Sequence, residues 1–501
     1  MNKSLSTLFE GLVTVSEDLH IANITLDSRK VVSGSLFFAL AKQAEQRQAH
    51  LQQALQQGAV AVAFSSEQVL TSTEKALVDE YAVEAIAVAG LEHQVSEIAA
   101  RFYDRPSASL KVIAVTGTNG KTSVTHYIAE ALEKLNFPCA LIGTLGHGRL
   151  PTLRDNGMTT PDPISVQAIL AECVAAGVDY VALEASSHAL DQGRLNAVEI
   201  DIAVFTNLTR DHLDYHLNMQ AYAESKMRLF KMPSVQTAIV NLDDEMGRRI
   251  QSECQPHMRV LGYSIQQQAD AVLQAKQVIP KHDGIEFELV SEQHQTSIQT
   301  ALLGAFNVAN LLATAAVLKA LEISPDQISK VLSDCHSVTG RMQATTGLAA
   351  PTVVIDYAHT PDALKQVLTA LRWHAIDQAD LWCVFGCGGD RDRGKRPEMG
   401  MIAEQQADHL VITDDNPRYE ASQQIIDDIL SGCRDPQQIH VQADRGKAIQ
   451  FAVQRAAQKD IVLIAGKGHE TTQEIAGVKY PFNDMQIVSQ ILQSPNRECL
   501  L

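Results

Sequence analysis

The sequence feature that most constrains the fold is a glycine-rich loop that directly follows a short apolar run. Residues 111–115 (Lys-Val-Ile-Ala-Val) are mostly β-branched and apolar, which predicts a buried strand. Residues 116–122 (Thr-Gly-Thr-Asn-Gly-Lys-Thr) come next, and a helix is expected after them. A strand, a glycine-rich turn and a helix in this order are typical of α/β domains whose ligand lies at the end of the strand.

The loop has the composition of a phosphate-binding site. Gly117 and Gly120 allow backbone N–H groups to close around phosphate oxygens, and the N-terminus of the following helix adds its positive end. Lys121 can reach the terminal phosphates of ATP, and the Thr122 hydroxyl can ligate Mg²⁺. The pattern G-x-x-G-K-T is a shortened P-loop, because Val115 stands where the longer pattern has a glycine.

The rest of the chain alternates short apolar runs with helical segments in two blocks. The first block begins at residue 110 and the second near residue 350. Alternating strands and helices predict a mostly parallel sheet that is covered on both faces. Further strands are expected at 180–183, 202–205 and 238–240 in the first block, and at 352–355, 381–385, 410–413 and 461–464 in the second.

At roughly 100–200 residues per domain, a chain of 501 residues suggests three domains. We expect an α/β fold made of a small N-terminal α/β module, a central P-loop-type domain with a mostly parallel sheet, and a C-terminal Rossmann-like α/β domain. Their expected limits are 1–108, 109–338 and 339–501. Pro and Ser in 104–109 predict an exposed linker, and residues 337–341 predict a hinge.

Composition excludes several classes of protein. Hydrophobic residues make up 45% of the chain and charged residues 20%, which argues against disorder. A net charge of −18 with 5% aromatic residues argues against a broad nucleic-acid-binding face. The first 19 residues do not resemble a signal peptide, and no run of 18 apolar residues predicts a membrane span. Eight scattered cysteines are typical of free thiols, so we expect a cytoplasmic protein.

Polar residues follow several of the expected strands. Glu184 and His212 follow two strands of the first block, which makes them candidate metal ligands. In the second block, three strands are followed by 386–397, 414–418 and 465–470, which are rich in Gly, Arg and Asp. These ends predict a site for a substrate that is both anionic and cationic. By pattern alone, Lys226 is an ordinary surface lysine.

Several motifs together resemble those of the Mur ligases, the ATP-dependent amide-forming ligases of peptidoglycan synthesis. The resemblance runs essentially end to end. Its motifs are residues 27–29, 34–39, 116–122, 184–188, 207–214, 304–310, 356–361 and 415–418. The last motif, Asp-Asn-Pro-Arg, is similar to the one by which family members that add meso-diaminopimelate differ from those that add L-lysine.

The resemblance implies a reaction in two steps. The γ-carboxylate of D-Glu in UDP-MurNAc-L-Ala-D-Glu attacks the ATP γ-phosphate, an acyl phosphate forms, and the amine of diaminopimelate displaces phosphate. The substrates are therefore small molecules, with Mg²⁺ as cofactor and no nucleic acid or membrane as partner. We expect a monomer.

The resemblance also assigns the ATP and metal sites. The metal ligands are Thr122, Glu184 and His212. The catalytic residues are Lys121, His212 and Lys226, of which Lys226 corresponds to a carbamylated lysine. The ATP-binding residues are Gly117, Thr118, Asn119, Gly120, Lys121, Thr122, Ser123, Asn307, Arg341 and Asp356.

Two further sets of residues follow from the resemblance. Those for the UDP-MurNAc-dipeptide are Leu26, Ser28, Lys42, Gln43, Ala44, Thr159, Thr160, Ser186, Gln192, Arg194 and Lys226. Those for diaminopimelate are Arg391, Asp415, Asn416, Pro417, Arg418, Gly466 and Glu470. Lys42 and Met158 depart from the pattern of some members, which have His and Asn there.

Three alternatives are open at this point. A lysine-adding homologue would not need Arg418, because the planar guanidinium of Arg418 suits a distal carboxylate and L-lysine has none. A folylpolyglutamate synthetase would not need a uridine-type N-terminal module. A P-loop NTPase acting as a switch or transport motor would not need the charged strand ends of the second block.

Overall fold

The computed structural model describes residues 2–68, 70–254, 256–292, 294–347, 350–376 and 378–493. The chain divides into two units. The first spans the residues up to 263 together with 268–272 and 316–322, and the second consists of 264–267, 273–315 and the residues from 323 onward. The predicted domain limits at 108 and 338 stay predictions.

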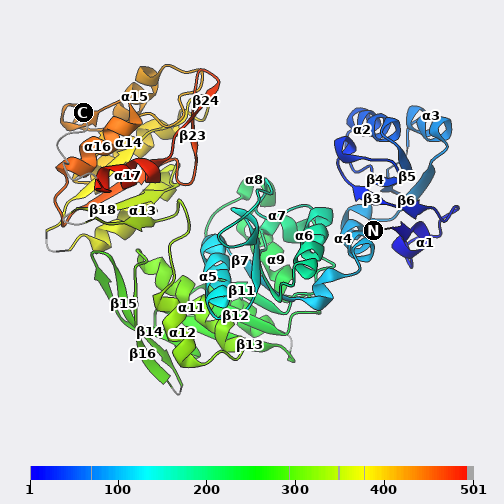
Figure 1. The fold of residues 1–501 in the computed structure, drawn as a ribbon, viewed down its shortest axis with the longest axis horizontal. Helices are drawn as coiled ribbons and strands as arrows, with labels where there is room; N and C mark the ends of the chain where they lie inside the picture. Colours follow the sequence, from blue (N-terminus) through cyan, green and yellow to red (C-terminus); the bar gives the residue numbers. More distant parts are fainter. Residues whose placement is uncertain are drawn as a thin grey trace. The chain divides into compact units, whose positions relative to one another are not determined.

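The N-terminal part of the first unit (Figure 1, blue) is a four-stranded parallel sheet in the order β3-β4-β5-β6. Its strands are β3 (Asn23–Thr25), β4 (Ser35–Phe38), β5 (Ala59–Ser65) and β6 (Glu84–Val88). Helices α2 (Ala44–Gln56) and α3 (Ser72–Tyr81) pack with one apolar cluster, and α1 (Leu5–Leu8) and α4 (Leu91–Phe102) with another. Both faces of the sheet are therefore covered, as a parallel sheet requires.

The larger sheet of the first unit has the order β13-β12-β11-β7-β10-β8-β9 (Figure 1, cyan to green). The strands are β7 (Lys111–Thr116), β8 (Cys139–Gly143), β9 (Gly146–Arg149), β10 (Tyr180–Glu184), β11 (Ile202–Phe205), β12 (Thr237–Asn241) and β13 (Arg259–Ser264). All pair in parallel except β9. The helices between them are α5 (Lys121–Lys134), α6 (Pro163–Ala175), α7 (Ser187–Asp191), α8 (Leu213–His216), α9 (Met219–Phe230) and α10 (Glu245–Glu253).

The second unit begins with an antiparallel meander of β14 (Leu273–Lys281), β15 (Gly284–Ser291) and β16 (His294–Thr300). Helices α11 (Ala305–Ala320) and α12 (Pro325–Ser333) follow in the chain. This meander was not predicted, because the strands were predicted from continuous apolar runs. Its strands instead alternate polar and apolar residues, which is the pattern of a sheet covered on one face only.

The C-terminal sheet has the order β17-β18-β22-β19-β20-β21 (Figure 1, yellow to red) and is parallel except for β17. Its strands are β17 (Gln343–Thr345), β18 (Thr352–Asp356), β19 (Leu381–Phe385), β20 (His409–Ile412), β21 (His440–Val441) and β22 (Ile461–Ala465). Helices α13 (Pro361–His374), α14 (Lys395–Gln406) and α15 (Ser422–Leu430) pack with one cluster, and α16 (Arg445–Arg455) and α17 (Asp484–Gln493) with the other. A hairpin of β23 (Thr472–Ile475) and β24 (Val478–Pro481) follows β22.

The predicted α/β class with mostly parallel sheets is confirmed. In the segment predicted to be a linker, residues 104, 105, 108 and 109 are exposed, as expected, whereas residues 106 and 107 are buried. Pro106–Ser109 is a 3₁₀ helix in which Pro106 and Ser107 are buried. The Ser107 hydroxyl accepts a hydrogen bond from the Glu199 amide at 3.0 Å. The expectation that little of this segment is buried is therefore wrong only for Pro106 and Ser107.

Within the described part of the chain, no helix is long and apolar enough to cross a membrane. The seven cysteines that the structure describes are free thiols, and Cys499 lies outside the described residues.

Candidate active site

Six neighbouring parallel strands of the larger sheet of the first unit end at one edge, which we call its carboxyl edge. There the glycine-rich loop after β7 is held against the end of β11. The amides of Thr118 and Asn119 donate to the backbone oxygen and the Oδ1 of Asn207, at 2.8 and 3.0 Å. Gly117 has φ +149°, and a Cβ there would overlap the Thr206 hydroxyl. The loop is therefore preformed, with the N-terminus of α5 at its end.

Two lysines lie at this loop. Lys121 Nζ donates to the carbonyl oxygens of Gly117 and Thr118, both at 2.9 Å, and Lys226 Nζ donates to the Gly117 oxygen at 2.8 Å. Lys226 also lies 4.4 Å from the centre of the Tyr222 ring. It is 1% exposed, so its interpretation as a surface lysine is wrong.

Burial, with a smaller contribution from the nearby charge of Lys121, holds the pKa of Lys226 well below its ordinary value. A buried amine beside a second cation favours its neutral form, because the charged form loses hydration and meets a like charge. Lys226 is therefore disposed to act as a neutral amine.

Glu184, at the end of β10, is fully buried beside the loop. The Thr122 hydroxyl donates to its Oε2 at 3.0 Å, and the Thr144 amide donates to its Oε1 at 2.7 Å. Gly143 has to lack a side chain, because a Cβ there would overlap this carboxylate. Hydroxyl and carboxylate oxygens are donors that suit Mg²⁺, which usually takes only one or two protein ligands. The pair fits that ion, although the described residues contain no group of three or more His, Cys, Asp or Glu arranged for a metal.

A cavity of about 250 Å³ brings much of the predicted site together. Arg194 crosses one side of it, donating from Nη1 to the Thr160 oxygen at 2.7 Å and from Nη2 to Gln192 Oε1 at 2.7 Å. The Thr160 hydroxyl in turn bonds the Glu184 backbone oxygen at 2.6 Å and lies 3.1 Å from the Ser186 hydroxyl. The lining residues are Lys121, Met158, Thr159, Thr160, Ser186, Ser187, His188, Arg194, His212, Tyr222 and Lys226.

Aromatic rings surround His212 in this cavity. Its ring centre lies 5.0 Å from that of His188 and 6.0 Å from that of Tyr222. The Tyr222 hydroxyl lies 3.1 Å from that of Thr118, so this side chain joins the loop to Lys226. Sequence reasoning missed Tyr222, although its spacing of four residues from Lys226 places both on one face of α9.

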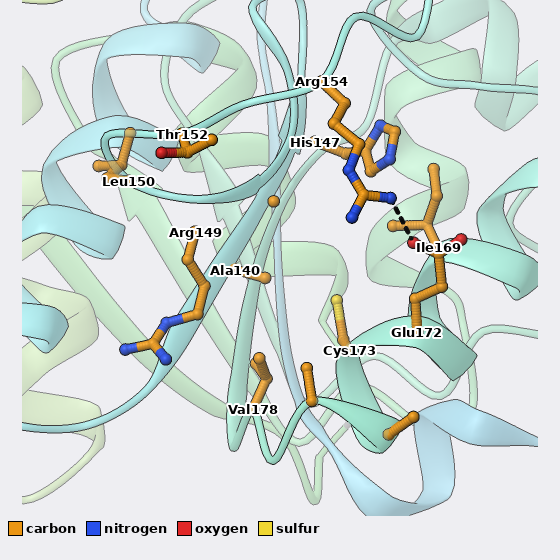
Figure 2. A pocket seen from close by; sticks show the side chains of 13 residues that line it. Ala140, His147, Arg149, Leu150, Thr152, Arg154, Ile169, Glu172, Cys173 and Val178 are labelled. Atoms are coloured by element: carbon orange, nitrogen blue, oxygen red, sulfur yellow. Dashed lines mark hydrogen bonds and ion pairs between the residues drawn. The ribbon is translucent and has the colours of Figure 1, made fainter.

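A larger cavity, of about 770 Å³, lies elsewhere, around β8, β9 and α6 (Figure 2). Of its two arginines, Arg149 and Arg154, the second is paired with Glu172 at 3.1 Å, and apolar residues such as Ile169 and Val178 form much of its wall. None of the predicted ATP, metal or peptide residues lines it.

Five of the residues predicted for the UDP-MurNAc-dipeptide lie at the carboxyl edge of the N-terminal sheet. Leu26 and Ser28 follow β3, while Lys42, Gln43 and Ala44 follow the adjacent parallel strand β4. The Ser28 hydroxyl donates to Gln53 Oε1 on α2 at 2.7 Å. The last three residues are exposed, which suits contacts to a ligand.

The carboxyl edge of the C-terminal sheet gathers the predicted amino-acid residues. Asn416 Nδ2 donates to Asp415 Oδ1 at 3.1 Å and to Glu470 Oε2 at 2.9 Å. Gly466 lies against this group, because a Cβ there would be 2.9 Å from Asp415 Oδ2. Sequence reasoning missed Lys467, whose Nζ donates to Glu470 Oε2 at 2.8 Å; its signal was the spacing of three residues from Glu470.

Two arginines border the same edge at Gly388. A Cβ on Gly388 would lie 3.0 Å from Arg418 Nη1 and 3.5 Å from Arg391 Cγ. Arg418 has φ +51° and donates from Nη1 to the Gly389 oxygen at 2.8 Å. Pro417, just before it, has its carbonyl oxygen packed against Gly389. The edge thus combines carboxylates with guanidinium groups, as a zwitterionic ligand requires.

The remaining predicted ATP residues belong to the second unit, whereas the glycine-rich loop belongs to the first. Asn307 is buried on α11, with Nδ2 donating to the Leu303 oxygen at 2.8 Å. Asp356, at the end of β18, accepts hydrogen bonds from the amides of Met342 and Ala358, both at 2.8 Å. Burial raises the pKa of Asp356, while these hydrogen bonds and the charge of Arg341 oppose the rise.

A phosphate-binding loop that shares its cavity with a histidine, an arginine and a buried lysine defines an enzyme that uses a nucleotide beside a second substrate. The chain belongs to the Mur ligase family. Residues 115–318 match the Mur ligase middle domain, and residues 340–468 match the Mur ligase glutamate ligase domain.

Relatives with a printed activity are similar over almost the whole chain. The UDP-N-acetylmuramoyl-L-alanyl-D-glutamate–2,6-diaminopimelate ligase of Pseudomonas putida is 46% identical over 494 residues, which cover 97% of each chain. The enzyme of the same name from Coxiella burnetii is 44% identical, with 98% of this chain and 99% of the relative covered. A solved structure of a ligase with this name is 36% identical, has a TM-score of 0.75 and is matched over 98% of this chain and 99% of its own.

Proposed function

We propose that this chain is the ATP-dependent ligase that joins meso-2,6-diaminopimelate to the D-Glu γ-carboxylate of UDP-MurNAc-L-Ala-D-Glu. The single observation that carries this proposal is the cavity in which Lys121 of the phosphate loop lies with Thr160, Ser186 and Arg194, the residues predicted for the peptide. A phosphate donor and a carboxylate acceptor can meet there. The activity printed for the relatives supports the same reaction.

The proposed chemistry consists of two substitutions. A carboxylate oxygen of D-Glu bonds to the γ-phosphorus as the bond to ADP breaks, which gives an acyl phosphate. The amine of diaminopimelate then bonds to the acyl carbon, phosphate leaves with the electron pair of the C–O bond, and the amine loses a proton. Lys121 and the N-terminus of α5 neutralise phosphate charge, and Arg194 orients the peptide carboxylate.

Thr122 and Glu184 would hold one Mg²⁺ beside the phosphates, and His212 would help hold a second. When bound, Mg²⁺ offsets the charge that accumulates on the transferred phosphoryl group. The oxygen donors of Thr122 and Glu184, 3.0 Å apart, support this assignment.

Lys226 is proposed to be carbamylated. Its neutral amine would add to CO₂ and release one proton, giving N–COO⁻. The remaining N–H can still donate to the Gly117 oxygen, which now accepts from Nζ at 2.8 Å. The lowered pKa of Lys226 supports the proposal, because only a neutral amine is nucleophilic.

The carboxyl edge of the C-terminal sheet is proposed to select diaminopimelate over L-lysine through Arg418. Its guanidinium can bind the distal carboxylate, which lysine lacks. Binding lysine would leave the guanidinium without that partner, and a mismatch of this kind supports discrimination of about 10⁴-fold. Asp415 and Glu470 would accept hydrogen bonds from an amino group of the same ligand, and Asn416 would orient both carboxylates through its Nδ2.

A phosphate-release assay that omits each substrate in turn tests this function. Release is expected only with ATP, the nucleotide-dipeptide and diaminopimelate together. A P-loop switch or motor would release phosphate from ATP without the peptide or the amino acid, and that result would refute the proposal.

A further inference from the structure

Lys467 is a fully buried lysine at the carboxyl edge of the C-terminal sheet, in the loop after β22. Its Nζ donates to Glu470 Oε2 at 2.8 Å and to Asn416 Oδ1 at 3.1 Å, and it lies 3.7 Å from Asp415 Oδ1. Lysine is almost never fully buried unless it is paired. All three partners belong to the predicted amino-acid site, so the position of this ammonium group bears on that site.

The hydrogen bonds of Lys467 fix the orientation of the Asn416 amide. Asn416 Oδ1 accepts from Lys467 Nζ and from the Glu474 amide, the latter at 2.9 Å, while Nδ2 donates to the carboxylates of Asp415 and Glu470. A flipped amide would face donors with its nitrogen and acceptors with its oxygen. Lys467 and the Glu474 amide therefore fix Asn416, whose Nδ2 holds Glu470 in place, and the Glu470 carboxylate is the group that remains available to a ligand.

Lys467 lies on the buried side of this group and Glu470 on its open side. The side chain of Lys467 is 0% exposed, and that of Glu470 is 33% exposed. A carboxylate has about four acceptor sites, so Glu470 can accept from a ligand while it is bonded to Lys467 and Asn416. Packing alone does not explain the lysine, because an apolar side chain of similar volume avoids the cost of burying a charge.

We propose that Lys467 is a positioning residue of the amino-acid site: directly and through the Asn416 amide, it holds the Glu470 carboxylate so that this carboxylate receives an amino group of the incoming amino acid. The inference rests on the proposed function, since it assumes that an α-amino acid binds at this edge. Lys467 itself does not touch the substrate.

The charge of Lys467 also acts on Glu470. Burial alone would raise the pKa of Glu470, but hydrogen bonds from Lys467 and Asn416 outweigh it and leave the pKa below its ordinary value. The charged and titratable groups that face Glu470 are Lys467, His469, Asp415, Arg445 and Tyr357. Without Lys467, the pKa of Glu470 should rise, so the carboxylate should take up a proton at a higher pH.

The test compares Lys467→Met with the wild-type protein in steady-state kinetics. We expect the KM for diaminopimelate to rise by about 10- to 100-fold, because hydrogen bonds to a charged group are misdirected. The KM for ATP should stay near the wild-type value. Lys447→Met, an exposed lysine on α16, is the matched control and should change neither KM.

The pH profile provides a readout that a purely structural role would not move. Glu470 must be ionised to accept a hydrogen bond from an ammonium group. The value of kcat/KM for diaminopimelate should therefore fall as the pH drops below the pKa of Glu470. In Lys467→Met this acidic limb should shift to higher pH, and in Lys467→Arg, which keeps the charge, it should stay near the wild-type position. If Lys467→Met does not fold, the position of the acidic limb in Lys467→Arg alone tests the inference.

An unchanged KM for diaminopimelate in Lys467→Met, an equal rise in both KM values, or an acidic limb that moves in the Arg variant would overturn the inference. A wild-type protein that does not use diaminopimelate would overturn the proposed function and this inference together. Wild-type turnover combined with an unaffected Met variant would overturn the inference alone.

Discussion

Lys121 and Lys226 donate to the same backbone oxygen, that of Gly117, and this arrangement connects the phosphate loop to helix α9. Two ammonium groups that share one acceptor repel each other, and only Lys121 can be relieved by a phosphate. The buried Lys226 therefore gains from losing its charge. The sequence pattern of α9 did not indicate that Lys226 is buried beside a second cation, because a pattern shows the spacing of residues and not what packs against the helix.

Carbamylation of Lys226 should depend on CO₂ and on pH. Protein freed of CO₂ should lose activity and regain it with bicarbonate, and ¹³CO₂ should label Lys226 in a carbon NMR spectrum. Because the pKa of Lys226 is lowered, the amine is neutral above that pKa, so labelling should increase with pH and fall as the amine protonates.

Lys226→Ala should lower kcat by roughly 10²-fold or more without a matching loss of stability. Lys231→Ala, an exposed lysine just after α9, is the control and should keep both labelling and activity. Wild-type activity that is indifferent to CO₂, with no ¹³C signal, would count against the carbamate.

Arg418 offers a second test at the scale of one side chain. Arg418→Ala should lower kcat/KM for diaminopimelate by roughly 10²-fold or more, because the distal carboxylate loses a charged partner. The KM for ATP should remain near normal. Arg434→Ala, an exposed arginine after α15, should leave both unchanged. A parallel loss of ATP affinity in competition binding would contradict the assignment.

At the scale of elements, strand ends bring the sites together. The apolar runs were predicted with nearly the right bounds, since β10 is Tyr180–Glu184 and β22 is Ile461–Ala465. Parallel pairing then places residues that are far apart in sequence at one edge, as the predictions for Glu184 and Asp415 assumed. The spacing of Tyr222 from Lys226 and of Lys467 from Glu470 is visible in the sequence, but their roles depend on tertiary contacts that spacing alone does not show.

The glycine-rich loop should not tolerate a side chain at Gly117. Gly117→Ala adds a Cβ that overlaps the Thr206 hydroxyl, which should displace the loop and destabilise the protein by about 1–3 kcal/mol. ATP affinity should fall about tenfold or more. Gly177→Ala is matched for positive φ, at +70°, and has open space around its Cβ.

The control variant should lose stability through backbone strain alone and keep its ATP affinity. Calorimetric titration with ATP and thermal unfolding of both variants measure the difference. Equal ATP affinity in the two alanine variants would show that the close approach of Gly117 to Thr206 has no role in binding.

At the scale of the whole molecule, each unit carries part of the predicted site. The first contains the phosphate loop, Glu184 and the residues predicted for the nucleotide-peptide, and the second contains the edge at which Asp415 and Arg418 lie. The phosphate loop, Glu184 and the charged segments of the second block were predicted because they follow strands, whereas the residues for the nucleotide-peptide were predicted from the family resemblance. The contacts inside each unit, such as that of Lys226 with Gly117, could not be predicted, since they join residues more than a hundred positions apart.

The measurement that tests the central claim most directly follows the oxygen atoms of the activated carboxylate. The D-Glu γ-carboxylate of the nucleotide-dipeptide is labelled with ¹⁸O, and the products are analysed by mass spectrometry. If an acyl phosphate forms, one ¹⁸O should appear in the released phosphate and one should stay in the new amide carbonyl. Phosphate that carries no ¹⁸O would mean that water, and not the substrate carboxylate, attacked ATP, and this would contradict the account.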